Sequence, residues 1–142
     1  MVVIVPIYAG LFALIYIYLA TRVIGLRRTF RVALGHGGHS KLERAQRAHG
    51  NFAEYVPFAL LLITFIEMRG TNVLVVHLLC LFLLVARALH AYNVSKEREN
   101  IRLRVVAMTT TFGVYGVAAA ILVFGGFIRA DRKSTRLNSS HT

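Results

Sequence analysis

Cysteines and acidic side chains are scarce in this chain of 142 residues, and each shortage excludes a class of site. The single cysteine, Cys80, lies inside an apolar run, so the sequence predicts no disulfide framework. His36 and His39 flank two glycines, but without cysteine or carboxylate ligands nearby they predict no metal site. The chain has only 6 acidic residues but 17 lysines and arginines, which gives a formal net charge of +11.

The cations lie between long apolar stretches, and 56% of the residues are hydrophobic. Charges in this position fix the topology of a membrane protein and contact anionic lipid headgroups. A nucleic-acid-binding protein would instead gather its cations on one soluble face. The sequence therefore predicts contact with membrane lipid and no nucleic-acid partner.

Four apolar segments are long enough to cross a bilayer, at about residues 2–21, 41–68, 73–93 and 101–128. The sequence thus predicts an all-α integral membrane four-helix bundle. Ser40 and Glu43 have the spacing of a capping box, with Ser40 as N-cap of the second helix. Four short helices leave little interior for polar groups, so we expect the chain to assemble with copies of itself.

The connections after the first and third segments are rich in arginine and lysine, whereas the turn between the second and third holds only Arg69 against Glu67. Because basic loops stay in the cytoplasm, the sequence predicts that both termini lie outside it.

Residues 131–142 look like the in-frame translation of a common sequencing adapter. We expect the membrane domain to occupy residues 1–130 and the tail to be read-through that is not native.

A polar stripe interrupts the apolar pattern where the second span begins. Arg47, Asn51, Glu54 and Tyr55 stand at i, i+4, i+7 and i+8, which places them on one face of a helix. Lipid would penalise such a stripe heavily, so it must face protein, a cavity or a ligand.

The motif Arg47-Ala48-x-x-Asn51-x-x-Glu54-Tyr55-x-Pro57 resembles the second-helix signature of the MAPEG family, the membrane-associated proteins of eicosanoid and glutathione metabolism. Arg87-x-x-His90 is similar to the family's third-helix pattern, and the basic start of the fourth segment also fits. The resemblance covers about residues 2–128.

This resemblance implies a homotrimer in a bacterial inner membrane, with glutathione as co-substrate bound between subunits at the cytoplasmic rim. The glutathione-binding residues, carried over by position, would be Arg47, Asn51, Glu54, Tyr55, Arg87, His90 and Arg102. Family members place an arginine near the start of helix four beside the thiol. Arg102 or Arg104 could match it, and we favour Arg104 as the catalytic residue.

The chemistry of these side chains agrees with such a ligand. Arginine suits the carboxylates of glutathione, Glu54 can accept its ammonium group, and Asn51 can bond a peptide group. A nearby cation also favours the thiolate, which is the nucleophilic form of the thiol. A lipophilic electrophile could then reach the thiolate from the bilayer.

Two other interpretations remain open from the residues alone. The polar stripe could be an interhelical network that only holds a membrane scaffold together. Glu54 could also be the coupling carboxylate of a small four-span cation or drug transporter, which would exchange protons for its substrate.

Overall fold

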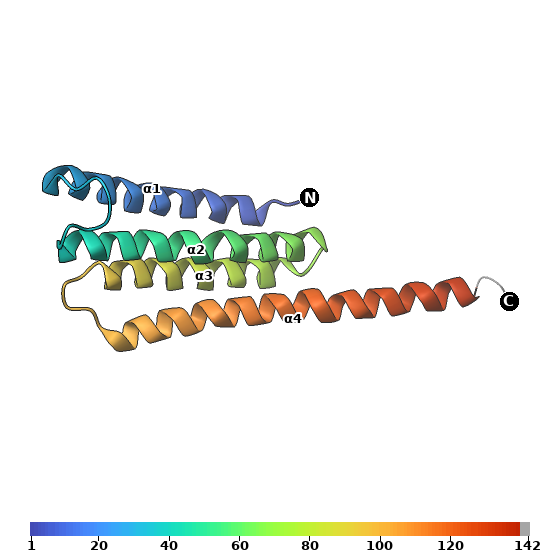
Figure 1. The fold of residues 1–142 in the computed structure, drawn as a ribbon. Coiled ribbons are helices and arrows are strands. Elements are labelled where there is room, and N and C mark those ends of the chain that lie inside the picture. Colours follow the sequence, from blue (N-terminus) through green and yellow to red (C-terminus); the bar gives the residue numbers. More distant parts are fainter. Residues whose placement is uncertain (140–142) are drawn as a thin grey trace.

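The computed structural model describes the backbone of residues 1–139 and the side chains of residues 1–126. It contains the helices α1 (Ile4–Phe30), α2 (Ser40–Met68), α3 (Val73–Val94) and α4 (Ile101–Ser139). They run up and down in chain order, as Figure 1 shows. Helices α2 and α3 form the centre, because each contacts the other three helices, whereas the described residues of α1 and α4 make no contact with one another. The predicted all-α four-helix membrane bundle is confirmed.

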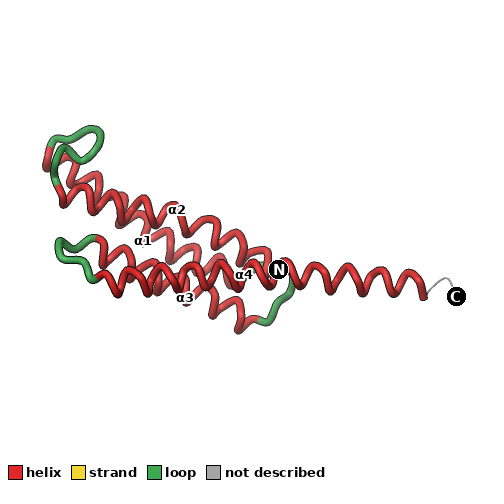
Figure 2. The backbone as a smooth tube through the Cα atoms, turned by 60° about the horizontal axis from the view of Figure 1, so that its bottom comes forward, coloured by secondary structure: helices red, strands yellow, loops and turns green. Residues whose placement is uncertain are grey.

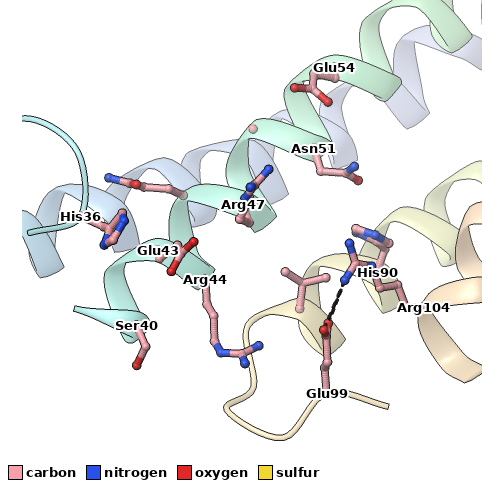
Figure 3. A pocket seen from close by; sticks show the side chains of 13 residues that line it. His36, Ser40, Glu43, Arg44, Arg47, Asn51, Glu54, His90, Glu99 and Arg104 are labelled. Carbon is pink, nitrogen blue, oxygen red and sulfur yellow. Dashed lines mark hydrogen bonds and ion pairs between the residues drawn. The ribbon is translucent and has the colours of Figure 1, made fainter. Parts of the chain in front are cut away.

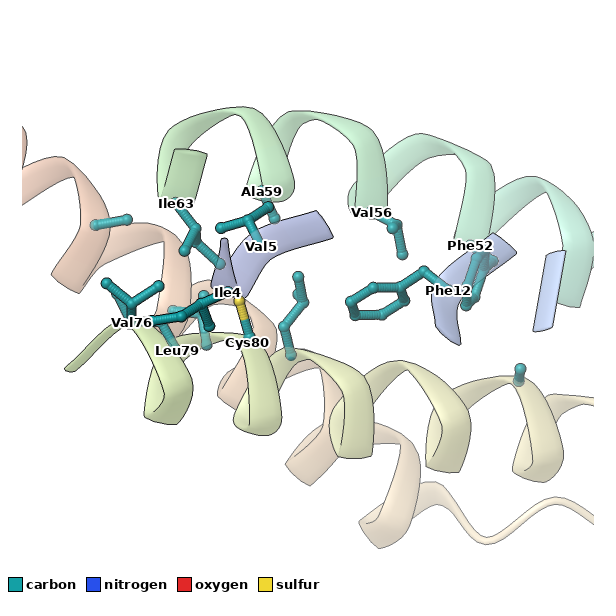
Figure 4. Close-up of a cluster of buried hydrophobic side chains, with 14 of the residues drawn as sticks. Ile4, Val5, Phe12, Phe52, Val56, Ala59, Ile63, Val76, Leu79 and Cys80 are labelled. Atoms are coloured by element: carbon teal, nitrogen blue, oxygen red, sulfur yellow. The ribbon is translucent and has the colours of Figure 1, made fainter. Parts of the chain in front are cut away.

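The core consists of apolar side chains from all four helices, packed along the bundle axis (Figure 4). Phe12 of α1 packs against Phe52 of α2 with ring centroids 6.0 Å apart, and Ile63, Val76 and Cys80 are fully buried farther along the bundle. The outward faces carry large exposed apolar side chains, among them Leu14, Phe58, Phe82 and Phe124. All four helices are long and apolar enough to cross a membrane, so these faces suit lipid or a neighbouring subunit.

The first helix is longer than the predicted span, which ended near residue 21. It stays helical to Phe30, and Arg31 ends it in the left-handed conformation with φ 56°. The predicted span ended where the apolar run ends. A helix, however, continues past the membrane into water for as long as its backbone hydrogen bonds form. The first loop is therefore only residues 31–39, shown green in Figure 2.

The predicted capping box at Ser40 is wrong. Ser40 is already helical, His39 is the N-cap, and none of the described side chains caps this end. The His39 carbonyl instead accepts the backbone N–H groups of Leu42 and Glu43, both at 3.0 Å. The fourth helix also extends past the predicted limit of 128, to Ser139. That the tail is read-through stays a prediction, and residues 140–142 lie outside the described residues.

The bundle end opposite the two long loops is closed by side-chain-to-backbone hydrogen bonds. Glu67 accepts from the backbone N–H groups of Val3 at 2.7 Å, Ile4 at 2.6 Å and Val5 at 2.9 Å. These are backbone donors at the start of α1 that have no partner within the helix, and the N-cap residue Val3 adds no side-chain hydrogen bond in the described part of the chain. Arg69 donates to the carbonyl of Leu122 on α4. The last turn of α2 and the turn after it thus join both outer helices to the centre.

Candidate functional site

An open cavity of about 820 Å³, called the rim cavity below, lies at the bundle end that carries both long loops. Side chains from α2, the end of α3, the start of α4 and both loops surround it (Figure 3). Its lining residues are His36, Ser40, Glu43, Arg44, Gln46, Arg47, Gly50, Asn51, Glu54, His90, Val94, Glu99 and Arg104.

Helix α2 supplies one wall of the rim cavity. Its core face is made of small and apolar side chains, including Ala48 and Phe52, so the adjacent face presents Arg47, Asn51 and Glu54 to the cavity. Arg47 and Glu54 are exposed, whereas the side-chain oxygen of Asn51 is buried and has no donor among the described residues. A buried amide oxygen without a donor costs free energy until a partner arrives. This atom is available to a ligand N–H group.

Helix α3 contributes His90, which is only 3% exposed and lines the cavity. Arg87 lies one turn earlier and is only 1% exposed, but it is not part of the cavity wall. Its two terminal nitrogens reach the sulfur of Met108 at 3.8 and 3.7 Å, and its Cζ lies 5.4 Å from the ring centroid of Tyr55. Its Nε has no acceptor among the described residues. The structure therefore places Arg87 behind the site, between α2 and α4.

Tyr55 is also placed outside the rim cavity. Its ring packs edge-on against Phe112 of α4 at 5.8 Å, and its carbonyl accepts the Tyr115 hydroxyl at 2.7 Å. Tyr55 and Arg87 thus form the contact between α2, α3 and α4 beside the cavity. Their assignment to glutathione stays a prediction.

The two candidate arginines of α4 differ in position. Both side chains are exposed, but Arg104 lines the rim cavity and Arg102 does not. Arg104 forms an ion pair with Glu99, at 3.2 Å. The structure therefore brings Arg47, Asn51, Glu54, His90 and Arg104 together at one cavity.

The start of α4 is fixed by two asparagines. Asn93 is 1% exposed, donates to the carbonyl of Asn100 and accepts its backbone N–H, both at 2.9 Å. The Asn100 side chain in turn accepts from the backbone N–H groups of Arg102 at 3.0 Å and Leu103 at 3.3 Å. This N-cap sets where the helix begins and hence which arginine faces the cavity.

The MAPEG family model matches residues 5–124, which is most of the chain. The chain belongs to the MAPEG family. It is 43% identical over 86 residues to the "Inner membrane protein YecN" of Escherichia coli K12, and equally to that of Escherichia coli O6:H1 strain CFT073. The match covers 61% of this chain and 66% of each relative, just under two thirds of their length.

Membership of the MAPEG family suggests a membrane function related to glutathione. The four spans and the likeness to an inner membrane protein support a multi-pass inner membrane protein. Both the family and the helical membrane fold agree with the sequence-based expectation.

Several polar and charged residues of this MAPEG cavity were missed by sequence reasoning. His36 comes from the first loop, Glu43 and Arg44 from the first turns of α2, and Glu99 from the second loop. Arg44 and Glu43 are neighbours of the polar stripe, so a wider helical face would have included them. Glu99 and His36 gave no periodic signal, because loops bring them in.

The charges of the rim cavity suit a zwitterionic ligand. Among its described lining residues, only Glu99 and Arg104 are joined in an ion pair. Among the described residues, Arg44 and Arg47 have no carboxylate partner, and Glu54 has no cationic partner. Within the described residues there is no cluster of three or more metal-ligating side chains.

Proposed function

We propose that this protein is a membrane glutathione-dependent transferase or peroxidase of the bacterial inner membrane. Glutathione binds in the rim cavity at the cytoplasmic side, Arg104 stabilises its thiolate, and a lipophilic electrophile arrives from the bilayer. The protein acts as a homotrimer, so neighbouring subunits complete the site.

The observation that carries the proposal is the convergence on one cavity of three α2 stripe residues, His90 of α3 and Arg104 of α4. These come from three helices, so helical periodicity alone does not bring them together. A network that serves only the fold would join its charged side chains across helices, because an exposed charge without a partner holds no helices together. Here most of the cavity's charges lack partners within the described residues.

The chemistry of glutathione matches the free groups of the rim cavity. Its two carboxylates suit Arg44 and Arg47, whose planar guanidinium groups bind carboxylates through two hydrogen bonds. Its ammonium group can pair with Glu54, and one of its peptide N–H groups can donate to the side-chain oxygen of Asn51, which accepts no hydrogen bond from the described residues. Its thiol is a weak nucleophile until a cation favours the ionised form, which is the role of Arg104.

Calorimetry and a thiolate absorbance titration with glutathione, on protein purified in detergent, test this function. We expect binding and a thiolate signal near neutral pH. Arg104→Ala should abolish that signal and lower conjugation of a chlorodinitrobenzene electrophile roughly 100-fold, as removal of one transition-state donor does.

Arg98→Ala is the matched control, because Arg98 is exposed on the loop just before α4 and lies outside the rim cavity. Arg102→Ala should have a much smaller effect than Arg104→Ala. An unchanged thiolate signal in Arg104→Ala contradicts the role of Arg104. Binding of lipophilic cations without glutathione binding contradicts the function as a whole, and sedimentation in detergent tests the trimer.

A further inference from the structure

The cation assigned to the thiol already has a partner within its own chain. Arg104 Nη1 lies 3.2 Å from Glu99 Oε1 and 3.4 Å from Glu99 Oε2. Both residues line the rim cavity, and the dashed line in Figure 3 marks their contact. The Glu99 carboxylate thus occupies the place at the guanidinium that an anionic ligand would take.

This contact is held by the loop and is not a chance meeting of two flexible side chains. Glu99 directly precedes Asn100, whose backbone is bonded on both sides to the buried Asn93. The Asn100 carbonyl also accepts the backbone N–H of Arg104 at 3.1 Å. The two charged residues are therefore presented to one another by a fixed stretch of backbone.

The pair is nevertheless exposed enough to open. The Arg104 side chain is 52% exposed and that of Glu99 is 26% exposed. Exposed ion pairs stabilise proteins only weakly, because water solvates both partners well. An incoming anion with better geometry can therefore replace the carboxylate.

We propose that Glu99 is a specificity-determining residue that competes with the ligand for Arg104. In the ligand-free site its carboxylate neutralises the guanidinium, and only an anion that binds the guanidinium more favourably displaces it. The inference rests on the proposed function: Glu99 competes with the glutathione thiolate for the guanidinium of Arg104. It follows that Glu99 also opposes ionisation of the bound thiol, because it keeps a negative charge beside it.

Glu99→Gln tests the competition, since the amide keeps the shape of the side chain and removes its charge. Glu97→Gln is the matched control: it removes the same charge from the same loop, and Glu97 is exposed and lies outside the rim cavity. In Glu99→Gln we expect glutathione to bind roughly two- to fivefold more tightly, the range set by a weak exposed ion pair. The thiolate absorbance midpoint should move to lower pH, a shift that a purely structural role would not produce.

Circular dichroism and size-exclusion chromatography of both variants check that each is folded. Tighter binding and a lower midpoint in Glu99→Gln, with Glu97→Gln like the parent chain, support the competition, and so does binding that appears only in Glu99→Gln. Equal glutathione affinity in Glu99→Gln, Glu97→Gln and the parent chain overturns the competition. Weaker binding in Glu99→Gln also overturns it. Either result leaves the proposed function standing. Absence of glutathione binding in all three overturns both.

Discussion

The two ends of the bundle use the same residue types in opposite ways. At the closed end, the Glu67 carboxylate accepts three backbone N–H groups of α1, and Arg69 donates to a carbonyl of α4. At the loop end, Glu54 and Arg47 point into a cavity with no charged partner among the described residues. Charged side chains of α2 and the turn after it therefore hold helices together at one end and remain available to a ligand at the other.

The difference shows how a structural cluster of polar groups differs from a functional one. What matters is whether the groups have hydrogen-bond or ion-pair partners within the chain, more than whether such groups are present. Unpaired polar atoms gather at the loop end, where the Asn51 oxygen and the Arg87 Nε are both buried without partners in the described part of the chain. Such atoms cost stability. Their cost is offset when water, a ligand or another subunit supplies the missing partner.

The largest effect on stability should come from Glu67→Gln at the closed end. The amide offers one acceptor oxygen in place of two, and it loses the charge that favours the N-terminus of α1. We expect the free energy of unfolding to fall by about 2 kcal/mol. Thermal unfolding in detergent, followed by circular dichroism, measures it, with Glu97→Gln as the control. An unchanged midpoint would show that the three hydrogen bonds do not hold α1.

Much of this architecture was predictable, because bilayer thickness and helix periodicity leave few choices. The four spans follow from the length of the apolar runs, and the stripe follows from about 100° of rotation per residue. On that scale Asn51 and Glu54 lie about 40° and 20° to either side of Arg47, whereas Tyr55 lies about 80° round. The structure accordingly brings the first three to the rim cavity and turns Tyr55 toward α4.

The remaining site residues could not be predicted, because tertiary contacts that leave no periodic pattern in the sequence bring them to the cavity. Glu99 joins the site because Asn93 and Asn100 fold the second loop against α4. Asn100 directly before Ile101 was a local signal, since asparagine is a favoured N-cap. Its bond to a buried side chain seven residues earlier was not predictable from the sequence pattern.

A smaller effect, of opposite sign, should follow from Arg87→Met. The buried guanidinium has no carboxylate partner among the described residues, only the Met108 sulfur and the Tyr55 ring. Replacing an uncompensated buried charge with an apolar side chain of similar length removes a desolvation cost that exceeds the cation–π gain. We expect the free energy of unfolding to rise by up to about 1 kcal/mol. A loss of stability in the same assay would indicate an acidic partner from a neighbouring subunit.

The smallest effect on stability should come from Glu54→Gln, the counterpart on α2 of the first substitution. Glu54 is exposed, lines the rim cavity and has no ion pair or hydrogen bond in the described part of the chain, so the free energy of unfolding should change by less than about 0.5 kcal/mol. Glutathione affinity should nevertheless fall roughly tenfold, because the ligand ammonium loses a charged acceptor. Calorimetry and thermal unfolding on one preparation separate the two quantities. If Glu54→Gln destabilised the fold as much as Glu67→Gln, both ends of the bundle would be structural, and the contrast between them would not hold.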